Sequence, residues 1–300
     1  MLVWRLLTGM GASGVVPLAL TLMGDLFPYE ERGRPLGWLF GAMAAGAAFG
    51  APMGVIVESF IGWQALFLGI ALLGAGVLAL LLPYRALLGA RQVAGRMSFR
   101  GVLTGYRGLL GTGRGLRTYG YVFWNGIFHS GIFTWLGLYF SRRYGLGEVG
   151  IGLAILGYGI PGFLLGPIIG RTADRWGRRW LVPAGVGVGA AASTALMLDL
   201  PLFGATLAVI VLSLGFDMTQ PLLAGIVTTL GGKERGGQAM GLNVFMLFTG
   251  FGVGSFLFGE ALLRLGFGPA LAIFSAVQLA LTLAAVPLFR AEARSSGRTG

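Results

Sequence analysis

The ten residues Gly170-Arg171-Thr172-Ala173-Asp174-Arg175-Trp176-Gly177-Arg178-Arg179 join two apolar stretches of the chain, 150–169 and 180–199. Glycine permits a tight turn between helices, because it tolerates backbone angles that other residues avoid. Asp174 suits the positive end of a helix dipole, and the arginines suit the anionic inner surface of a membrane. An ordinary basic turn is the plain alternative. The full spacing instead favours a specific cytoplasmic motif, made of Gly170, Asp174, Arg175, Gly177, Arg178 and Arg179.

Apolar stretches of similar length recur along the whole chain. Nine of them have the ~20 residues that a spanning helix needs: 2–24, 36–57, 63–83, 118–140, 150–169, 180–199, 203–226, 239–262 and 269–289. The chain is 55% hydrophobic and 11% charged, whereas a soluble domain carries about 25% charged residues. Its 55 glycines fit close packing between membrane helices. We therefore predict an all-α membrane protein with nine transmembrane helices.

The basic residues gather in alternate loops. Of the 22 Lys and Arg residues, all but Arg5, Arg142, Arg143 and Arg264 fall within 25–35, 84–117, 170–179, 232–236 and 290–300. Because cytoplasmic loops are enriched in Lys and Arg, we expect these segments, including the C-terminus, on the cytoplasmic side of the plasma membrane. The same rule accounts for the net charge of +11 without a nucleic-acid partner. With no Cys and one His, we expect no metal site and no cofactor.

An internal repeat divides the chain at its longest loop. Segment 84–117 carries seven Arg and no acid, so an ordinary basic loop is one interpretation. However, 31–37 resembles 234–241, and the glycines that follow, at 37, 46 and 50, match those at 241, 250 and 254. Transporters are often built from such repeats. We therefore predict a partial N-terminal bundle at 1–83, a cytoplasmic linker at 84–117, a six-helix bundle at 118–289 and a cytoplasmic tail at 290–300.

The motif at 170–179 resembles the loop signature G-x-x-x-D-R-x-G-R-R of the major facilitator superfamily, in its copy between helices eight and nine. Residues 5–12 resemble the fourth-helix motif of that family, with Thr8 where Gln is usual. The fifth-helix antiporter motif is similar to the segment holding Gly46, Gly50, Pro52 and Gly54, with departures at Ala51 and Val55. The resemblance implies helices four to twelve of a twelve-helix, drug:proton antiporter-like fold, lacking the first three. By its pseudo-symmetry, Asp174 is expected to latch onto the helix beginning near 34–37.

Few polar residues interrupt the apolar spans. An ionisable side chain at the centre of a membrane costs roughly 2.5–3.5 kcal/mol on insertion scales, so it usually has a function or a partner. Asp217 is such a residue, with a locally satisfied structural acid as the alternative, and Arg5 is another unless it snorkels to the outer interface. The candidates for transport and proton coupling are Asp217, His129 and Arg5, and the candidates for lining a cavity are Asn125, Gln220 and Asn243.

These features predict a secondary active transporter of a small molecule, working by proton-coupled efflux and alternating access. We expect a monomer whose partners are the lipid bilayer, the substrate and protons. A sugar or metabolite permease of the same superfamily, and a truncated product without transport activity, remain as alternatives. A membrane acyltransferase would belong to another class, but His129 has no acid near it in the sequence and no Ser/His/Asp set can be assembled. We therefore predict that the chain is not an enzyme.

Overall fold

The computed structural model describes residues 2–16, 18–19, 22, 33–85, 99–231 and 235–292, and this part of the chain contains helices and no strand. The helices are α1 (Leu2–Ser13), α3 (Gly33–Leu81), the 3-10 turn η2 (Leu82–Tyr84), α5 (Phe99–Leu110), α6 (Gly113–Tyr144), α7 (Glu148–Ile155), α8 (Ile160–Trp176), α9 (Arg178–Ala195), α10 (Leu202–Leu230), α11 (Gly236–Leu265) and α12 (Phe267–Leu288). The all-α prediction is confirmed.

Several of these helices are suited to a membrane. Within the described residues, five stretches are long and apolar enough to cross a bilayer: Ile56–Tyr84, Glu148–Gly166, Leu202–Leu230, Gly236–Leu265 and Phe267–Leu288. Helices suit this solvent because they satisfy every backbone polar group within one segment. The chain is therefore a multi-pass membrane protein, while the count of nine spans stays a prediction.

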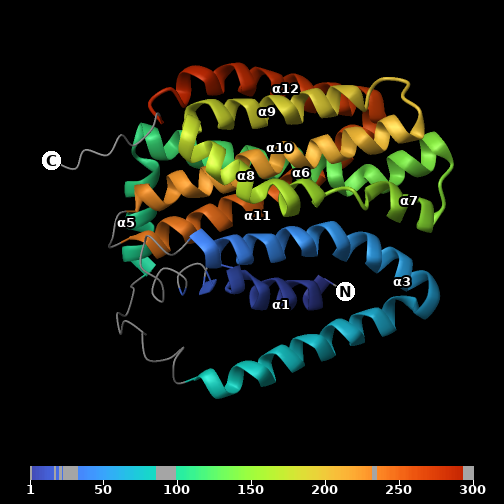
Figure 1. The fold of residues 1–300 in the computed structure, drawn as a ribbon, viewed down its shortest axis with the longest axis horizontal. Helices are drawn as coiled ribbons and strands as arrows, with labels where there is room; N and C mark the ends of the chain where they lie inside the picture. The colour runs from blue at the N-terminus through green and yellow to red at the C-terminus, as the bar shows by residue number, and fades with distance from the viewer. Residues whose placement is uncertain are drawn as a thin grey trace.

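Two predicted spans are one helix element with a sharp reversal. α3 contains the predicted span 36–57 and all but the last two residues of the predicted span 63–83. Its backbone turns back at Gly62, where φ is 77° and ψ is 157°. Figure 1 shows the two arms of α3 as a hairpin beside the larger bundle. A positive φ is cheap for glycine alone, so Gly62 makes the reversal possible without a longer loop.

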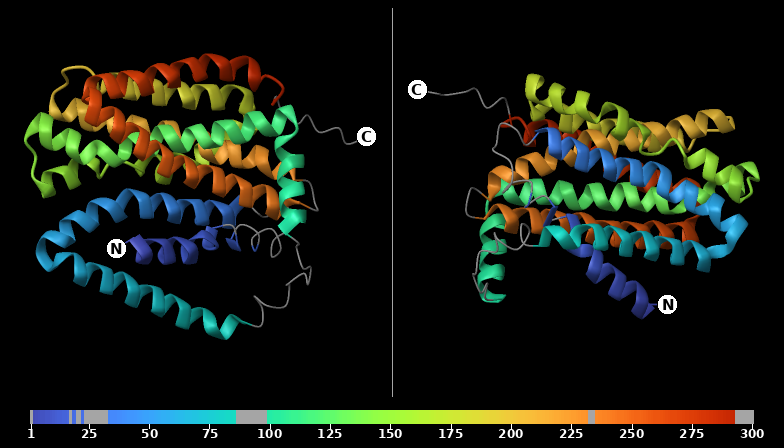
Figure 2. Two further views of the ribbon diagram at one scale, coloured as in Figure 1. Left: turned by 180° about the vertical axis from the view of Figure 1, so that it is seen from behind. Right: turned by 60° about the horizontal axis from the view of Figure 1, so that its bottom comes forward.

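Other boundaries also differ from the sequence-based expectation. The span predicted at 150–169 is split into α7 and α8. The predicted linker at 84–117 contains α5 and the start of α6, which begins at Gly113. The hydroxyl of Thr112, the residue before α6, accepts a hydrogen bond from the Gly115 N–H at 3.0 Å. Such a cap satisfies one of the free N–H groups of a helix start. In Figures 1 and 2, α5 runs across one end of the bundle.

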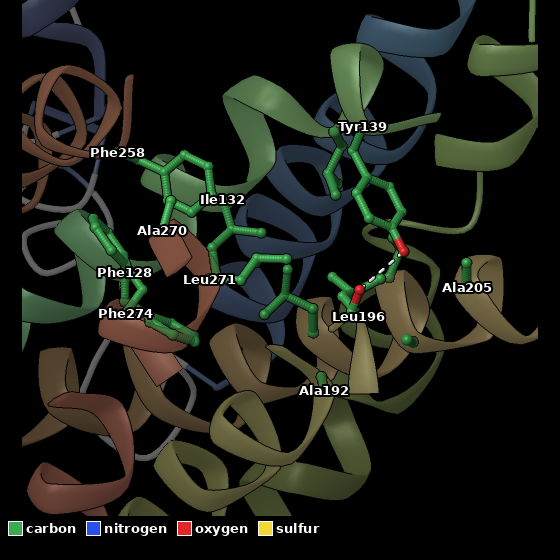
Figure 3. Packing of buried hydrophobic residues seen from close by; sticks show 14 of the residues in the cluster. Phe128, Ile132, Tyr139, Ala192, Leu196, Ala205, Phe258, Ala270, Leu271 and Phe274 are labelled. Carbon is green, nitrogen blue, oxygen red and sulfur yellow. Dashed lines mark hydrogen bonds between the residues drawn. The ribbon is translucent and has the colours of Figure 1, made fainter. Parts of the chain in front are cut away.

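The C-terminal helices form a closely packed bundle. α6 packs on α11, and α9 packs on both α10 and α12; Figure 2 shows the same neighbours from behind and from below. Aromatic and aliphatic side chains fill the centre, among them the fully buried Phe128 and Phe140. In Figure 3, the Tyr139 hydroxyl donates to the Leu196 carbonyl across this core, at 3.0 Å. Since lipid is as apolar as leucine, close packing rather than water exclusion holds such helices together.

Candidate functional site

The first part of the candidate site is Asp217, on α10, facing the break between α7 and α8. Ser213, one turn earlier on α10, donates a hydrogen bond to Asp217 Oδ2 at 3.1 Å and accepts one from the Gly159 N–H at 2.8 Å. The Asp217 carboxyl group also lies directly against Gly162, in the first turn of α8. Asp217, Ser213 and the start of α8 therefore form one connected polar cluster.

The break itself follows from the local sequence. Leu156 to Ile160 are joined by i→i−3 backbone bonds, and Gly159 has a φ of 91°. α8 then starts at Ile160 with Pro161 in its first turn, where a missing N–H costs nothing. This places a helix N-terminus inside the apolar stretch, and a carboxylate at such an end gains about 0.3–1 kcal/mol, and up to ~2 when partly buried.

A second cluster joins α6 to α10. The Asn125 Nδ2 donates to Gln220 Oε1 at 3.2 Å, and the Thr219 hydroxyl contacts Asn125 Oδ1 at 3.0 Å. All three residues are buried, so each bond offsets the cost of removing amide and hydroxyl groups from water. The structure thus brings together two of the three predicted cavity residues, although here they bind each other.

A third cluster lies where α6, α9 and α12 meet. The Trp124 indole N–H donates to Gln278 Oε1 at 2.6 Å, and Gln278 Nε2 donates to the Val186 carbonyl at 3.1 Å. Beside it, Ser275 donates to Ser193 at 2.8 Å. Gln278 was not among the predicted site residues, although a glutamine in the middle of the predicted span 269–289 is a visible signal.

His129 and Asn243 are buried without such partners. His129 is 2% exposed, and its ring packs edge-on against Phe128 and Phe216, at 5.0 and 5.3 Å between ring centres. Within the described residues, neither of its ring nitrogens has a hydrogen-bond partner, and neither has Asn243 Oδ1. Buried polar atoms of this kind are costly, so the His129 ring nitrogens and Asn243 Oδ1 are hydrogen-bonding groups that the described bundle leaves unused.

The other predicted site residues lie away from these clusters. Gly170 is within α8, and Gly177, with φ of 85°, is the single residue between α8 and α9. Arg178 follows it and lies against α10 at Gly225, while the Arg179 guanidinium lies 5.4 Å from the Trp180 ring centre. Four predicted site residues, Arg5, Pro52, Asp174 and Arg175, have side chains outside the described part of the structure, so the predicted Asp174 latch stays a prediction.

A charged cluster at the end of the bundle was not predicted. Glu292, just after α12, binds Arg114 at 2.7 Å and Arg117 at 2.5 Å, both near the start of α6. Its own backbone carbonyl accepts from the Arg179 N–H at 3.2 Å. The hydrogen bond from Arg114 is the largest influence on the carboxyl group and, with Arg117, holds the pKa of Glu292 below its usual 4.5, against the opposing effect of burial. The cluster ties three helices together.

These geometries define what the bundle can do chemically. Among the described residues, no three His, Cys, Asp or Glu side chains converge as metal ligands would. One ionisable carboxyl group sits at a helix break within an apolar segment, beside buried amides. Such an arrangement can bind and release a proton and can hydrogen-bond a small molecule, which are the tasks of a membrane transport site.

Comparison with known proteins agrees with this class. The model of the Major Facilitator Superfamily matches residues 1–255 and 122–300. The chain therefore belongs to the Major Facilitator Superfamily, a family of membrane transporters and not of enzymes.

Individual relatives carry similar names. The chain is 27% identical, over 237 residues, to the uncharacterized MFS-type transporter YwfA of Bacillus subtilis. This match covers 77% of this chain and 56% of YwfA. It is 30% identical over 67 residues to multidrug resistance protein 3 of Bacillus subtilis, covering 22% and 13%. It is 31% identical over 70 residues to a probable L-galactonate transporter of Escherichia coli, covering 23% and 16%. The chain thus spans about half the length of YwfA, and less of the other two.

Proposed function

We propose that this chain is part of a secondary active transporter that exports a small organic molecule in exchange for protons, by alternating access. The observation that carries the proposal is Asp217, an ionisable group placed at the α7–α8 break beside the buried amides of Asn125 and Gln220. A proton-driven carrier needs an ionisable group within the membrane that takes up a proton from one side and releases it on the other.

Other groups have secondary roles in this proposal. His129, with its unpaired ring nitrogens, binds substrate or tunes Asp217, and Asn243 offers a further acceptor when the bundle opens. When substrate binds, Asn125 and Gln220 give up the hydrogen bond between them and bond to the substrate instead. Arg5 is the next candidate for the proton-coupling group if Asp217 is not needed. The protein works as a monomer in the plasma membrane, with its C-terminus in the cytoplasm.

The direct test is transport by the whole encoded protein in proteoliposomes under an imposed pH gradient. Asp217→Asn is expected to abolish gradient-driven uptake of a fluorescent lipophilic cation such as ethidium, because the side chain no longer exchanges a proton. Asp199→Asn is the matched control, since Asp199 lies outside the apolar helices and pairs with Arg143 at 2.5 Å. Normal gradient-driven transport by Asp217→Asn would remove Asp217 from the mechanism.

The second candidate is a permease for a sugar acid or another metabolite, favoured by the similarity to a probable L-galactonate transporter. Uptake of labelled L-galactonate without uptake of the cation would support it over drug efflux. Absence of both, with correct membrane insertion, would support the third possibility, a product without transport activity.

The proposed orientation has its own test. The chain contains no Cys, so a single Ser296→Cys variant reports on the tail alone. Labelling by an impermeant thiol reagent is expected only after the cells are opened. Labelling from outside would overturn the proposed topology.

A further inference from the structure

The break between α7 and α8 is held from α10 by a short chain of hydrogen bonds. The Gly159 N–H donates to Ser213 Oγ, Ser213 donates to Asp217 Oδ2, and the same carboxyl group lies directly against Gly162 in the first turn of α8. We infer that Ser213 and the first turn of α8 at Gly162 position Asp217 as a lock on this break, and that protonation of Asp217 releases the lock. This inference rests on the proposed role of Asp217 as a group that protons reach.

The lock depends on charge because of what the start of α8 presents. The Ile160 N–H bonds to the Gly157 carbonyl and Pro161 has no N–H, so Gly162 carries the first backbone N–H of α8 without a local partner, and the Asp217 carboxyl group lies directly against this residue. A carboxylate accepts at both oxygens, whereas a protonated carboxyl group must donate from one of them. Hydrogen bonds to the ionised form are roughly twice as strong, and the attraction to the helix dipole disappears with the charge.

The backbone at the break is able to respond. Residues 156–160 are held by i→i−3 bonds of 2.8–3.3 Å rather than by a continuous α-helical ladder, and such stretches inside helices often mark hinges. Gly157 lies directly against the Ile210 side chain of α10. A change of angle between α7 and α8 is therefore transmitted to α10, which also carries Thr219 and Gln220.

Among the described side chains, few ionisable groups face Asp217. Tyr158, in the break, is close enough to interact with it electrostatically, and His129 of α6 reaches α10 at the neighbouring Phe216. The remaining charged residues of the helices packed on α10 fall near helix ends in the sequence: Arg114, Arg117, Arg142, Arg143, Glu148, Arg171, Asp174, Arg175, Arg178, Arg179, Arg235, Glu260 and Arg264. A pH response of the break therefore points to Asp217, with His129 and Tyr158 as the alternatives to exclude.

The test measures the break directly. Val149 on α7 and Leu164 on α8 are 45% and 60% exposed, so spin labels at Val149→Cys and Leu164→Cys are tolerated and lie on the order of 22 Å apart along a straight helix. Double electron–electron resonance in lipid nanodiscs is recorded at ~pH 8 and ~pH 5, on either side of the range where buried carboxyl groups titrate. We expect a shift of the mean distance between the two pH values.

The variants separate the lock from a general pH effect. Asp217→Asn is expected to show the low-pH distance at both pH values, while Asp199→Asn behaves as the parent chain. Ser213→Ala is expected to change the midpoint of the shift, and Ser213→Thr, which keeps the hydroxyl group, to restore it. Ser193→Ala is the matched control, because Ser193 is an equally buried serine bonded to Ser275 instead.

Each outcome decides the inference. A parent chain with the same distance at both pH values, or a pH shift that survives in Asp217→Asn, overturns it; in the second case, His129→Gln and Tyr158→Phe identify the responding group. Transport is read separately. If Asp217→Asn transports normally but no longer shows the pH shift, the proton-coupling proposal fails while the lock stands.

Discussion

Two matching glycine pairs, at 46 and 50 on α3 and at 250 and 254 on α11, have opposite surroundings. A side chain added at Gly250 or Gly254 would run into the backbone of α6, at Phe123, Gly126 and Ile127. One added at Gly46 or Gly50 meets nothing within 4 Å in the described structure. The same repeated sequence therefore lines a closed helix–helix seam in one half and, among the described residues, a face without a close neighbour in the other.

The difference shows what a small-residue face does in a membrane. Without water exclusion between helices, association depends on how closely the backbones approach, and at the α6–α11 seam the absence of a side chain is what permits contact. On α3, no described backbone lies close to Gly46 or Gly50, so the absence of a side chain there permits no such contact. The repeat therefore specifies a helix with a flat face, while the neighbouring chain decides whether that face contributes to stability.

The largest expected effect comes from filling the closed seam. Gly254→Leu places a side chain where the Ile127 backbone lies, so the helices must separate, and overpacking of this kind costs about 1–3 kcal/mol or more. Gly50→Leu, its counterpart on α3, is expected to change the free energy of unfolding by no more than about 0.5 kcal/mol, as for an open surface position. Thermal unfolding in detergent, followed by tryptophan fluorescence, measures both. Equal losses in the two variants would show that the face around Gly50 is also closed.

Much of the fold could be predicted from the sequence, because apolar runs of spanning length leave the backbone little choice but helix. The break at Gly159 was not predicted, since the apolar pattern runs through it without interruption. The signal was present in Gly157, Gly159 and Pro161, residues that interrupt helices. The reversal at Gly62 fell between two predicted spans and so was consistent with them.

The candidate site was predicted only in part. Asp217 stood out because charge is rare in apolar spans, whereas Ser213 did not, since serine is common in helices. The pairing of Asn125 with Gln220 depends on which faces of α6 and α10 meet, and no single-chain pattern specifies that. Glu292 was missed because its partners at the start of α6 are far away in the sequence, and only the packed bundle brings them together.

A second variant pair compares a buried glutamine of the closed bundle with an exposed one on α3. Gln278 is 1% exposed and joins Trp124 to the Val186 carbonyl, so Gln278→Leu leaves the Trp124 indole N–H unpaired at a cost of about 1–3 kcal/mol. The Val186 carbonyl lies within α9 and keeps its place in the helix ladder. Gln64, an exposed residue just past the reversal of α3, provides the control: Gln64→Leu is expected to leave the unfolding temperature almost unchanged. A comparable loss in both variants would contradict the view that polar satisfaction matters mainly in the closed bundle.

The smallest expected effect concerns charge at the end of the bundle, and it depends on pH. The pKa of Glu292 in the folded chain lies below its usual 4.5, chiefly through the hydrogen bond from Arg114. A carboxyl group whose pKa is lowered by folding stabilises the folded state at any pH above its pKa in the unfolded chain. This contribution disappears as the pH falls through its pKa in the folded chain. Glu292→Gln is therefore expected to lose about 1 kcal/mol near neutral pH, and the difference from the parent chain should vanish in acid. Glu58→Gln, on an exposed part of α3, is expected to show no such difference at either pH. If the Glu292→Gln deficit were constant across the range, the side chain would act through packing, and the charged cluster would not be what ties α6 to the end of α12.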